Sequence, residues 1–188
     1  MQTDRYSAAV GSGEIATDRF YCLDQEEINS SMIQLRPAEE KDNLFIETVY
    51  RTTREDELNL TNWPELQKKA FITMQSMAQL AEYKKNYPGA AYQLIMYKKK
   101  PAGRFYTWEN DNEIRLIDIT LLPQFRGKGI GTSLLGELIK KSNKVQKKIS
   151  LHVDPVNPAL RLYRRLGFIR IKNNGRHYYM ERTPAVFS

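Results

Sequence analysis

The residues best suited to chemistry lie in a glycine-rich turn that follows a long apolar run. Residues 114–122 are rich in Ile and Leu, a pattern typical of a strand that is covered on both faces. Pro123 ends this run, and three glycines then allow the backbone to approach a ligand closely: Gly127, Gly129 and Gly131. A helix that begins here adds the partial positive charge of its N-terminus. The turn is therefore expected to bind an anion, and a phosphate fits it best.

Two side chains add formal positive charge to the turn, the guanidinium of Arg126 and the ammonium of Lys128. The turn is not a P-loop, because no Ser or Thr follows Lys128. A dinucleotide-binding Rossmann turn would need a third glycine where Leu134 stands. Asp154 does lie near where that fold places its ribose-binding acid, so NAD remains an alternative ligand.

A second motif lies downstream, at residues 157–168, and reads Asn-Pro-Ala-Leu-Arg-Leu-Tyr-Arg-Arg-Leu-Gly-Phe. Asn157 is expected to cap a helix, with Pro158 at the first helical position and Gly167 as the left-handed residue that ends it. Tyr163 lies on the apolar face of this helix. By composition alone that face is an ordinary buried one.

Together the two motifs resemble the signatures of the GCN5-related N-acetyltransferases, the GNAT family. Arg126-x-x-Gly129-x-Gly131 resembles its acyl-CoA pyrophosphate loop, and residues 157–168 resemble its second signature. The resemblance covers roughly residues 32–182. It implies an α/β (α+β) fold, with a mixed, mostly antiparallel twisted sheet of about six to seven strands, a splayed parallel pair and about four flanking helices.

The resemblance also implies acetyl-CoA as co-substrate and direct acetyl transfer to a primary amine in a ternary complex. It assigns the pantetheine arm to backbone groups at Ile119 and Leu121. It assigns the pyrophosphate to the loop residues Arg126, Gly127, Lys128, Gly129, Ile130, Gly131 and Thr132. Asn157 is a secondary ligand contact beside its capping role, and Tyr163 matches the general acid that protonates the CoA sulfur.

The general base is less clearly marked. Glu113 precedes Arg126 by thirteen residues and matches the base of histone-type members, although an exposed carboxylate near a turn would look the same. Asp118 is the second candidate, because a lone carboxylate in an apolar strand is costly. A water relay is the third. His152 fits a core histidine better than a catalyst, and Cys22 has no visible activating partner.

Composition favours one catalytic domain over residues 32–188, preceded by an extension over residues 1–31. The extension carries two basic and six acidic residues, which leaves a net charge of +11 on the rest of the chain. A CoA ligand, itself a polyanion, accounts for this basic charge as well as nucleic acid would, so no nucleic acid partner is expected. Lacking a signal peptide or membrane span, the chain is expected to be cytoplasmic; with one cysteine and two histidines, no metal site is expected.

The remaining pattern predicts the elements that position these residues. Helices are expected at residues 38–51, 62–86 and 130–141, and strands at 32–37, 91–97, 103–109, 149–153, 168–172 and 177–182, the last two joined by a primed turn over residues 173–175. Trp63, Phe71 and Met74 are candidate acceptor contacts. The acceptor is expected to be a small-molecule amine, with a peptide or protein amine, or a non-catalytic CoA-binding module, as alternatives. A homodimer is also considered.

Overall fold

The computed structural model describes residues 32–185, so the expected extension over residues 1–31 lies outside the described residues. Within this part of the chain, seven strands form one sheet in the order β1-β2-β3-β4-β5-β7-β6. The strands are β1 Ile33–Pro37, β2 Ala91–Tyr97, β3 Lys100–Glu109, β4 Glu113–Leu121, β5 Lys148–Val153, β6 Ile169–Asn173 and β7 Tyr178–Arg182. All neighbouring pairs are antiparallel except β4 and β5. The expected mixed, mostly antiparallel sheet is confirmed.

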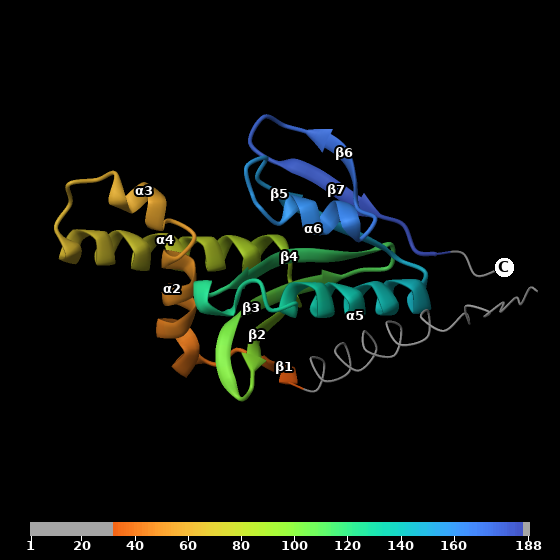
Figure 1. Ribbon diagram of the computed structural model, residues 1–188, viewed down its shortest axis with the longest axis horizontal. Coiled ribbons are helices and arrows are strands. Elements are labelled where there is room, and N and C mark those ends of the chain that lie inside the picture. The colour runs from red at the N-terminus through yellow and green to blue at the C-terminus, as the bar shows by residue number, and fades with distance from the viewer. Residues whose placement is uncertain (1–31, 186–188) are drawn as a thin grey trace, which may run out of the picture.

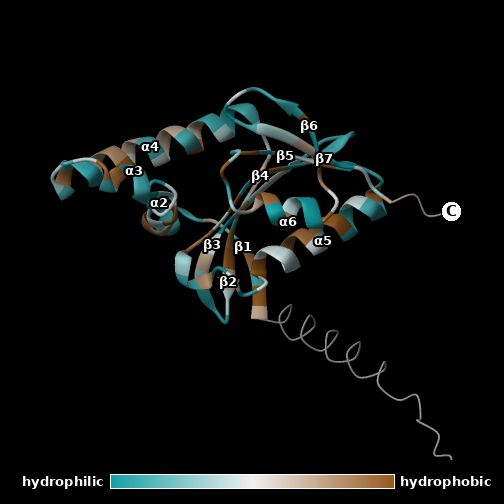
Figure 2. Ribbon diagram, turned by 45° about the horizontal axis from the view of Figure 1, so that its top comes forward, coloured by the Kyte–Doolittle hydropathy of each residue, from teal (hydrophilic) through white to brown (hydrophobic). Residues whose placement is uncertain are grey.

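Helices cover both faces of the sheet. The α-helices are α2 Asn43–Arg51, α3 Glu55–Asn59, α4 Glu65–Asn86, α5 Ile130–Val145 and α6 Leu160–Arg165, and two short 3-10 helices are η1 Glu40–Asp42 and η2 Pro123–Phe125. Figure 2 shows α2, α3 and α4 on one side of the sheet and α5 and α6 on the other. The described residues thus hold five α-helices where about four were expected. The additional one is α3, a short helix in a region read as a connection. No helix among residues 32–185 is long and apolar enough to cross a membrane.

The parallel pair opens part-way along β4. Pairing runs from Glu113 opposite Lys148 to Leu116 opposite Leu151 and then stops, although β4 continues to Leu121. Figure 1 shows β5, β7 and β6 leaning away from the rest of the sheet beyond this point. The expected splayed pair is confirmed, and it leaves the backbone of β4 after Leu116 without a strand partner on the β5 side.

A β-bulge in β4 coincides with this opening. On the β3 side, Leu116 pairs with Thr107 and Asp118 with Tyr106, so Ile117 has no partner in the register. One extra residue reverses the alternation of side chains along the strand. Ile114 and Leu116 before Ile117, and Ile119 and Leu121 after it, therefore all pack in the core that includes α5.

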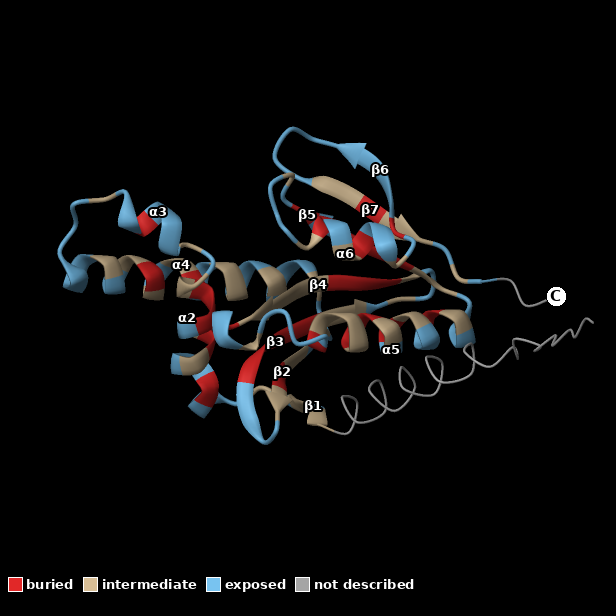
Figure 3. Cartoon of the chain, viewed as in Figure 1, coloured by how far each residue is buried: buried red, intermediate tan, exposed pale blue. Residues whose placement is uncertain are grey.

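The main hydrophobic core lies between the sheet and helices α5 and α6. Figure 3 shows buried residues along β4 and on the side of α5 that faces the sheet. Ile130, Leu134, Leu135 and Leu138 of α5 are at most 7% exposed and belong to this core. Each fully buried side chain of this size contributes about 1.5–3 kcal/mol. The core holds the glycine-rich turn against the open end of β4.

The two hairpin turns differ from the sequence expectation. Lys98 and Lys99 both have positive φ, 50° and 63°, and form a two-residue primed turn where a loop over residues 98–102 was expected. The primed turn expected at residues 173–175 is wrong, because only Gly175 has positive φ there. Instead, the Asn174 side-chain oxygen accepts hydrogen bonds from the backbone N–H groups of Arg176 and His177 and stabilises a longer loop.

Candidate active site

The glycine-rich turn has the geometry of an anion site. Gly127 and Gly129 have φ of 71° and 75°, in the left-handed region that favours glycine. Gly129 is the N-cap of α5, and the Ser133 N–H donates to its carbonyl oxygen at 2.9 Å. The N–H groups of the residues before Ser133 therefore point past the end of the helix, where the helix dipole is positive. These N–H groups can bind a phosphate.

Cationic side chains surround this helix end. The Arg126 Nε donates to the Leu121 carbonyl oxygen at 3.0 Å, which fixes an exposed guanidinium beside the end of β4. The Lys128 Nζ lies 5.9 Å from the centre of the Phe125 ring. Arg165 of α6 donates to the Thr132 Oγ1 at 3.3 Å. Arg165 was not predicted as part of the site, although it belongs to the second motif and follows Tyr163 by two residues.

Two of the predicted loop residues have structural roles as well. The Ile130 side chain is only 1% exposed and packs in the core, so only its backbone is available to a ligand. A Cβ atom on Gly131 would lie 3.5 Å from the Leu162 Cδ2, which shows how closely α5 and α6 approach at this point. The loop therefore offers the ligand backbone groups more than side chains.

Ile119 and Leu121 occupy the part of β4 that has left β5. Their side chains are partly buried against the main core, as expected for a covered strand. Their backbone groups on the β5 side have no strand partner among the described residues. An extended amide chain can pair with such an edge as an added strand would. The geometry therefore fits the pantetheine arm of CoA.

The second motif forms a helix that ends at Gly167 as predicted, but the predicted N-cap at Asn157 with Pro158 at the first helical position is wrong, because the N-cap is Ala159 and residues 158–159 form a turn. The Asn157 Oδ1 accepts a hydrogen bond from the Ala159 N–H at 2.8 Å, although α6 itself begins at Leu160. Gly167 has φ of 84°, and the Phe168 N–H donates to the Tyr163 carbonyl oxygen at 3.0 Å. These bonds make a Schellman motif, which the Tyr163 and Phe168 rings complete with centres 5.7 Å apart. The motif fixes the position of the Tyr163 ring.

Tyr163, the predicted general acid, lies in a buried environment. Burial raises the pKa of its hydroxyl, with a further contribution from the Asp118 carboxylate. The hydroxyl is therefore protonated at neutral pH.

Asp118 belongs to a buried polar network on the α4 side. Its carboxylate pairs with Arg104 at 2.7 Å, and the two side chains are 9% and 4% exposed. The Thr120 Oγ1 donates to it at 2.7 Å and the Tyr83 hydroxyl at 3.4 Å. Burial raises the pKa of the adjoining Tyr106 hydroxyl to about 12. Asp118, the second candidate base, therefore already has three partners.

Glu113, the first candidate base, lies at the closed end of the parallel pair. It faces Lys148 in the register, and the Asn110 Oδ1 accepts from its backbone N–H at 2.8 Å. Ile117, where β4 opens, is four residues further on, or about 13 Å at the usual rise of a strand. The pKa of Lys148 is raised mainly by its hydrogen bond to Glu181 and that of Tyr179 mainly by burial, and the charge of Glu113 makes a smaller contribution in the same direction to both.

A third group of polar residues lies where β5 leaves β4. Arg115 is 6% exposed, donates to the Ser150 Oγ at 3.0 Å and contacts the His152 Nδ1. Partial burial lowers the pKa of His152, and the charge of Arg115 and the nearby His177 lower it further. His152 was expected to be a core histidine, whereas it is exposed and lines a hollow of about 350 Å³. The sequence analysis did not identify Arg104 and Arg115 as site residues. A charged side chain within an otherwise apolar strand could have indicated both.

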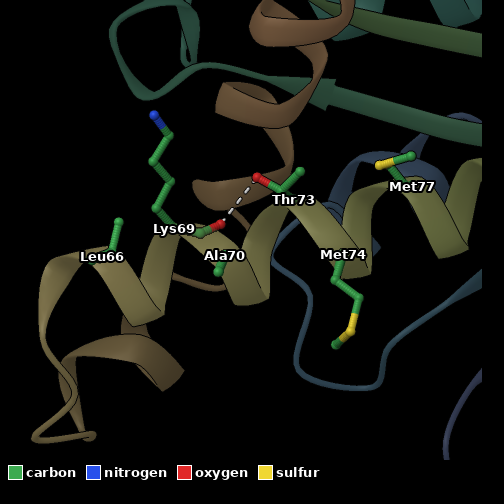
Figure 4. Close-up of a pocket in the computed structure, with 6 residues that line it drawn as sticks. All are labelled: Leu66, Lys69, Ala70, Thr73, Met74 and Met77. Atoms are coloured by element: carbon green, nitrogen blue, oxygen red, sulfur yellow. Dashed lines mark hydrogen bonds between the residues drawn. The ribbon is translucent and has the colours of Figure 1, made fainter.

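A larger hollow of about 630 Å³ follows the exposed side of α4. Figure 4 shows its lining residues, which recur at steps of three and four and so share one face of the helix. Most of them are exposed, so the hollow is an open surface. Lys69 and Thr73 are its polar residues. Of the other acceptor candidates, Trp63 packs against Phe71 with ring centres 5.4 Å apart. This surface lies on the half of α4 that extends beyond the sheet in Figure 1, away from the opening of β4.

Comparisons with known proteins agree with this geometry. The sequence model of the Acetyltransferase (GNAT) family matches residues 56–168. An N-alpha-acetyltransferase of Sulfurisphaera tokodaii is 39% identical over 73 residues, which cover 37% of this chain and 43% of that protein, less than half of its length.

Solved structures share the fold at low sequence identity. The PaiA N-acetyltransferase of Thermoplasma acidophilum, in complex with coenzyme A, superposes with a TM-score of 0.60 at 19% identity, over 80% of this chain and 98% of that one. The spermidine N-acetyltransferase of Vibrio cholerae, in complex with CoA and spermine, superposes with a TM-score of 0.56 at 20% identity, over 81% of this chain and 96% of that one. With the family model matching more than half of its length, this chain belongs to the acetyltransferase (GNAT) family, whose co-substrate is acetyl-CoA.

Proposed function

We propose that this protein is an acetyl-CoA-dependent N-acetyltransferase that transfers the acetyl group to a primary amine by direct attack in a ternary complex. One observation carries the proposal. The edge of β4 beyond Leu116 has no strand partner on the β5 side, the glycine-rich turn before α5 is tied to the end of this edge at Leu121, and Tyr163 is buried in the core that the sheet shares with α5 and α6. The membership of the GNAT family supports the same reading.

In this proposal the backbone of β4 holds the donor. Ile119 and Leu121 pair through their backbone groups with the pantetheine arm. The pyrophosphate lies against Arg126 and the backbone of the glycine loop, with Thr132 at the start of α5. Asn157 fixes the turn that leads into α6 and contributes the secondary contact. The loop N–H groups suit this role because they are directed at one point by Gly127 and Gly129.

Tyr163 acts as the acid in the chemical step. The amine nitrogen forms a bond to the acetyl carbon, the bond from that carbon to sulfur breaks, and Tyr163 gives its proton to the departing thiolate. Backbone N–H groups of β4 polarise the carbonyl, an effect worth about 3–4 kcal/mol of barrier for one donor. The amine gives its proton to Glu113 through water, because the distance of about 13 Å to the opening excludes direct contact.

The acceptor is proposed to be a small molecule with a primary amine. A peptide or protein amine is the second candidate, and the relative named as an N-alpha-acetyltransferase favours it, at 39% identity over 73 residues. Catalysis is assigned to residues 32–188, with residues 1–31 as an extension. The homodimer and the cytoplasmic location remain predictions from the sequence.

The experiment is a calorimetric titration of the full chain with acetyl-CoA, with NAD titrated in parallel, followed by initial-rate assays with a panel of amines. Saturable binding of acetyl-CoA alone, at about −8 kcal/mol, is expected. Double-reciprocal plots that intersect when both substrates are varied indicate a ternary complex. Binding of NAD in place of acetyl-CoA contradicts the proposal, and acetyl-CoA binding without transfer to any amine supports the non-catalytic module instead.

A further inference from the structure

The hollow of about 350 Å³ at the end of β5 has a lining that suits an anion. Its lining residues come from β5, β6, β7 and the loop between β6 and β7, and are His152, Lys172, Asn174, His177 and Tyr179. None of these residues is acidic. A hollow that offers donors and a cation without a carboxylate favours a negatively charged group.

Its position links it to the proposed reaction. His152 directly follows Leu151, the last residue of β5 that pairs with β4. Across the sheet, His152 pairs with Tyr179 and Tyr179 with Lys172, so the three residues form a row over adjacent strands. At about 4.8 Å between strands, the backbone of Lys172 lies about 10 Å from that of His152. The hollow therefore begins at the opening and extends about 10 Å from it.

The hydrogen bonds around the hollow leave donors directed at a ligand. Arg115 can only donate, so the His152 Nδ1 that it contacts is an acceptor and the proton lies on Nε2. The Asn174 Oδ1 already accepts two backbone N–H groups, which leaves its NH₂ group as the donor. The Lys172 ammonium adds a formal charge.

Two acidic side chains outside the lining bear on the hollow, Glu113 at the start of β4 and Glu181 on β7, and the charge of Glu113 acts on His152 and Tyr179. The charges of Lys172 and Arg115 together exceed the single charge of Glu113. Glu181 accepts from the Lys148 Nζ and from the Tyr179 hydroxyl, both at 2.5 Å. The Lys148 charge balances that of Glu181, so this carboxylate does not oppose an anion in the hollow. Arg115, buried beneath His152, adds positive charge below the lining.

We infer that this hollow binds a carboxylate of the acceptor, so that the acceptor is an amine carrying an acidic group within about 10 Å of the nitrogen. This inference rests on the proposed function and narrows its substrate class. An amino acid, or a peptide with an acidic residue at its N-terminus, has this chemistry. A polyamine has the opposite charge and is disfavoured at the same hollow.

The test compares matched acceptors with the full chain and saturating acetyl-CoA. Short peptides beginning with Glu or Asp are compared with the same peptides beginning with Gln or Asn, and free glutamate and spermidine are assayed beside them. The acidic peptides are expected to react with a kcat/KM at least about tenfold higher than their amides. Free glutamate reacting as well as the peptides identifies an amino acid acceptor. Equal values for acid and amide, or a preference for spermidine, overturn the inference.

The Lys172→Glu variant sharpens the comparison. Lys172 is exposed on the outer strand β6, so the fold tolerates the change. It is expected to reduce kcat/KM about tenfold for acidic peptides and to leave the amide peptides within twofold. Lys41→Glu is the matched control, since Lys41 follows β1 at the opposite edge of the sheet and forms an exposed salt bridge with Glu39. An equal effect of both variants on acidic peptides overturns the inference.

A binding measurement separates this inference from the proposed function. An N-acetylated Glu peptide, which cannot accept a further acetyl group, is titrated into the CoA-saturated protein while the His152 and His177 ring resonances are followed by NMR. Saturable shifts in the natural protein that Lys172→Glu weakens support the carboxylate site even if no amine is acetylated. No shift at millimolar peptide overturns it even if transfer to other amines occurs.

Discussion

The two faces of β4 differ in chemistry, one being apolar and the other charged. Toward α5, Ile114, Leu116 and Ile119 are apolar and pack in the main core, so only backbone groups remain for a ligand. Toward α4, Arg115 and Asp118 are charged and form side-chain networks with Ser150, His152 and Arg104. Under the proposed function, backbone groups of β4 hold the donor and side chains on the opposite face select the acceptor.

The bulge at Ile117 makes this division possible. Without the extra residue, Ile119 would face α4 and Asp118 would enter the apolar core, because a shift of one residue exchanges the two faces of a strand. A Cβ atom on Gly103 would lie 2.1 Å from the Thr120 carbonyl oxygen, so β3 closely supports β4 beyond the bulge. The strand therefore keeps its apolar face toward α5 along its whole length.

The largest effect is expected from Asp118→Asn, which tests the α4 face. The change leaves the Arg104 guanidinium buried without its counter-charge, and the free energy of unfolding should fall by about 3–5 kcal/mol. Urea denaturation followed by circular dichroism measures it. Asp111→Asn, in an exposed turn, is the control and should change stability by less than about 0.5 kcal/mol. A loss as small as that of the control would show that the α4 face does not depend on this pair.

Tyr163→Phe tests the proposed general acid. The variant keeps the ring that packs against Phe168 but removes the proton donor, so kcat should fall about 10²–10³-fold, or about 3–4 kcal/mol of barrier. The affinity for acetyl-CoA should be unchanged by calorimetry. Tyr87→Phe is the control, because the Tyr87 ring lies against Trp108 at the C-terminal end of α4. Unchanged turnover in Tyr163→Phe would remove its catalytic role.

The contrast between the faces also explains what the sequence could predict. The donor side depends on glycines with positive φ, which have local sequence signals, so Gly129 and Gly167 could be interpreted correctly. The N-cap predicted at Asn157 lies at Ala159 instead. The opening of the parallel pair followed from the resemblance of the motifs to a known family. These features are short-range or shared by a whole family.

The acceptor side could not be predicted in the same way. The contact of Arg115 with His152 joins residues 37 positions apart, and the pair of Arg104 with Asp118 depends on the register of β3 against β4. The continuous apolar run also hid the bulge, although its apolar core residues change from even to odd positions across Ile117. Pairings across strands need the register, which the sequence pattern alone does not fix.

A smaller effect is expected from Gly129→Ala on the donor face. Its φ of 75° is unfavourable for alanine by about 1–2 kcal/mol, so the loop should shift and the affinity for acetyl-CoA should fall about tenfold. Gly136→Ala is the matched control in the same helix, with no atom within 4 Å of the added Cβ. The comparison of the faces requires that the acceptor KM change in neither variant. A change in acceptor KM with Gly129→Ala would show that the donor site and the acceptor site depend on each other.

The smallest effect concerns pH, and it should arise on the α4 face alone. The pKa of His152 is lowered in the folded protein, mainly by burial and then by Arg115 and His177, while Glu113 acts in the opposite direction. Between the folded pKa and the ordinary value near 6.5, the unfolded chain binds a proton that the folded chain does not. Stability should therefore be complete above about pH 6.5 and should decrease as the pH falls below it. Urea denaturation from pH 5 to 8 measures this decrease, and His152→Gln should flatten it. If stability depends on pH in the same way in the His152→Gln variant, His152 is not the group that titrates. The contact between Arg115 and His152 then does not contribute to the pH dependence of stability.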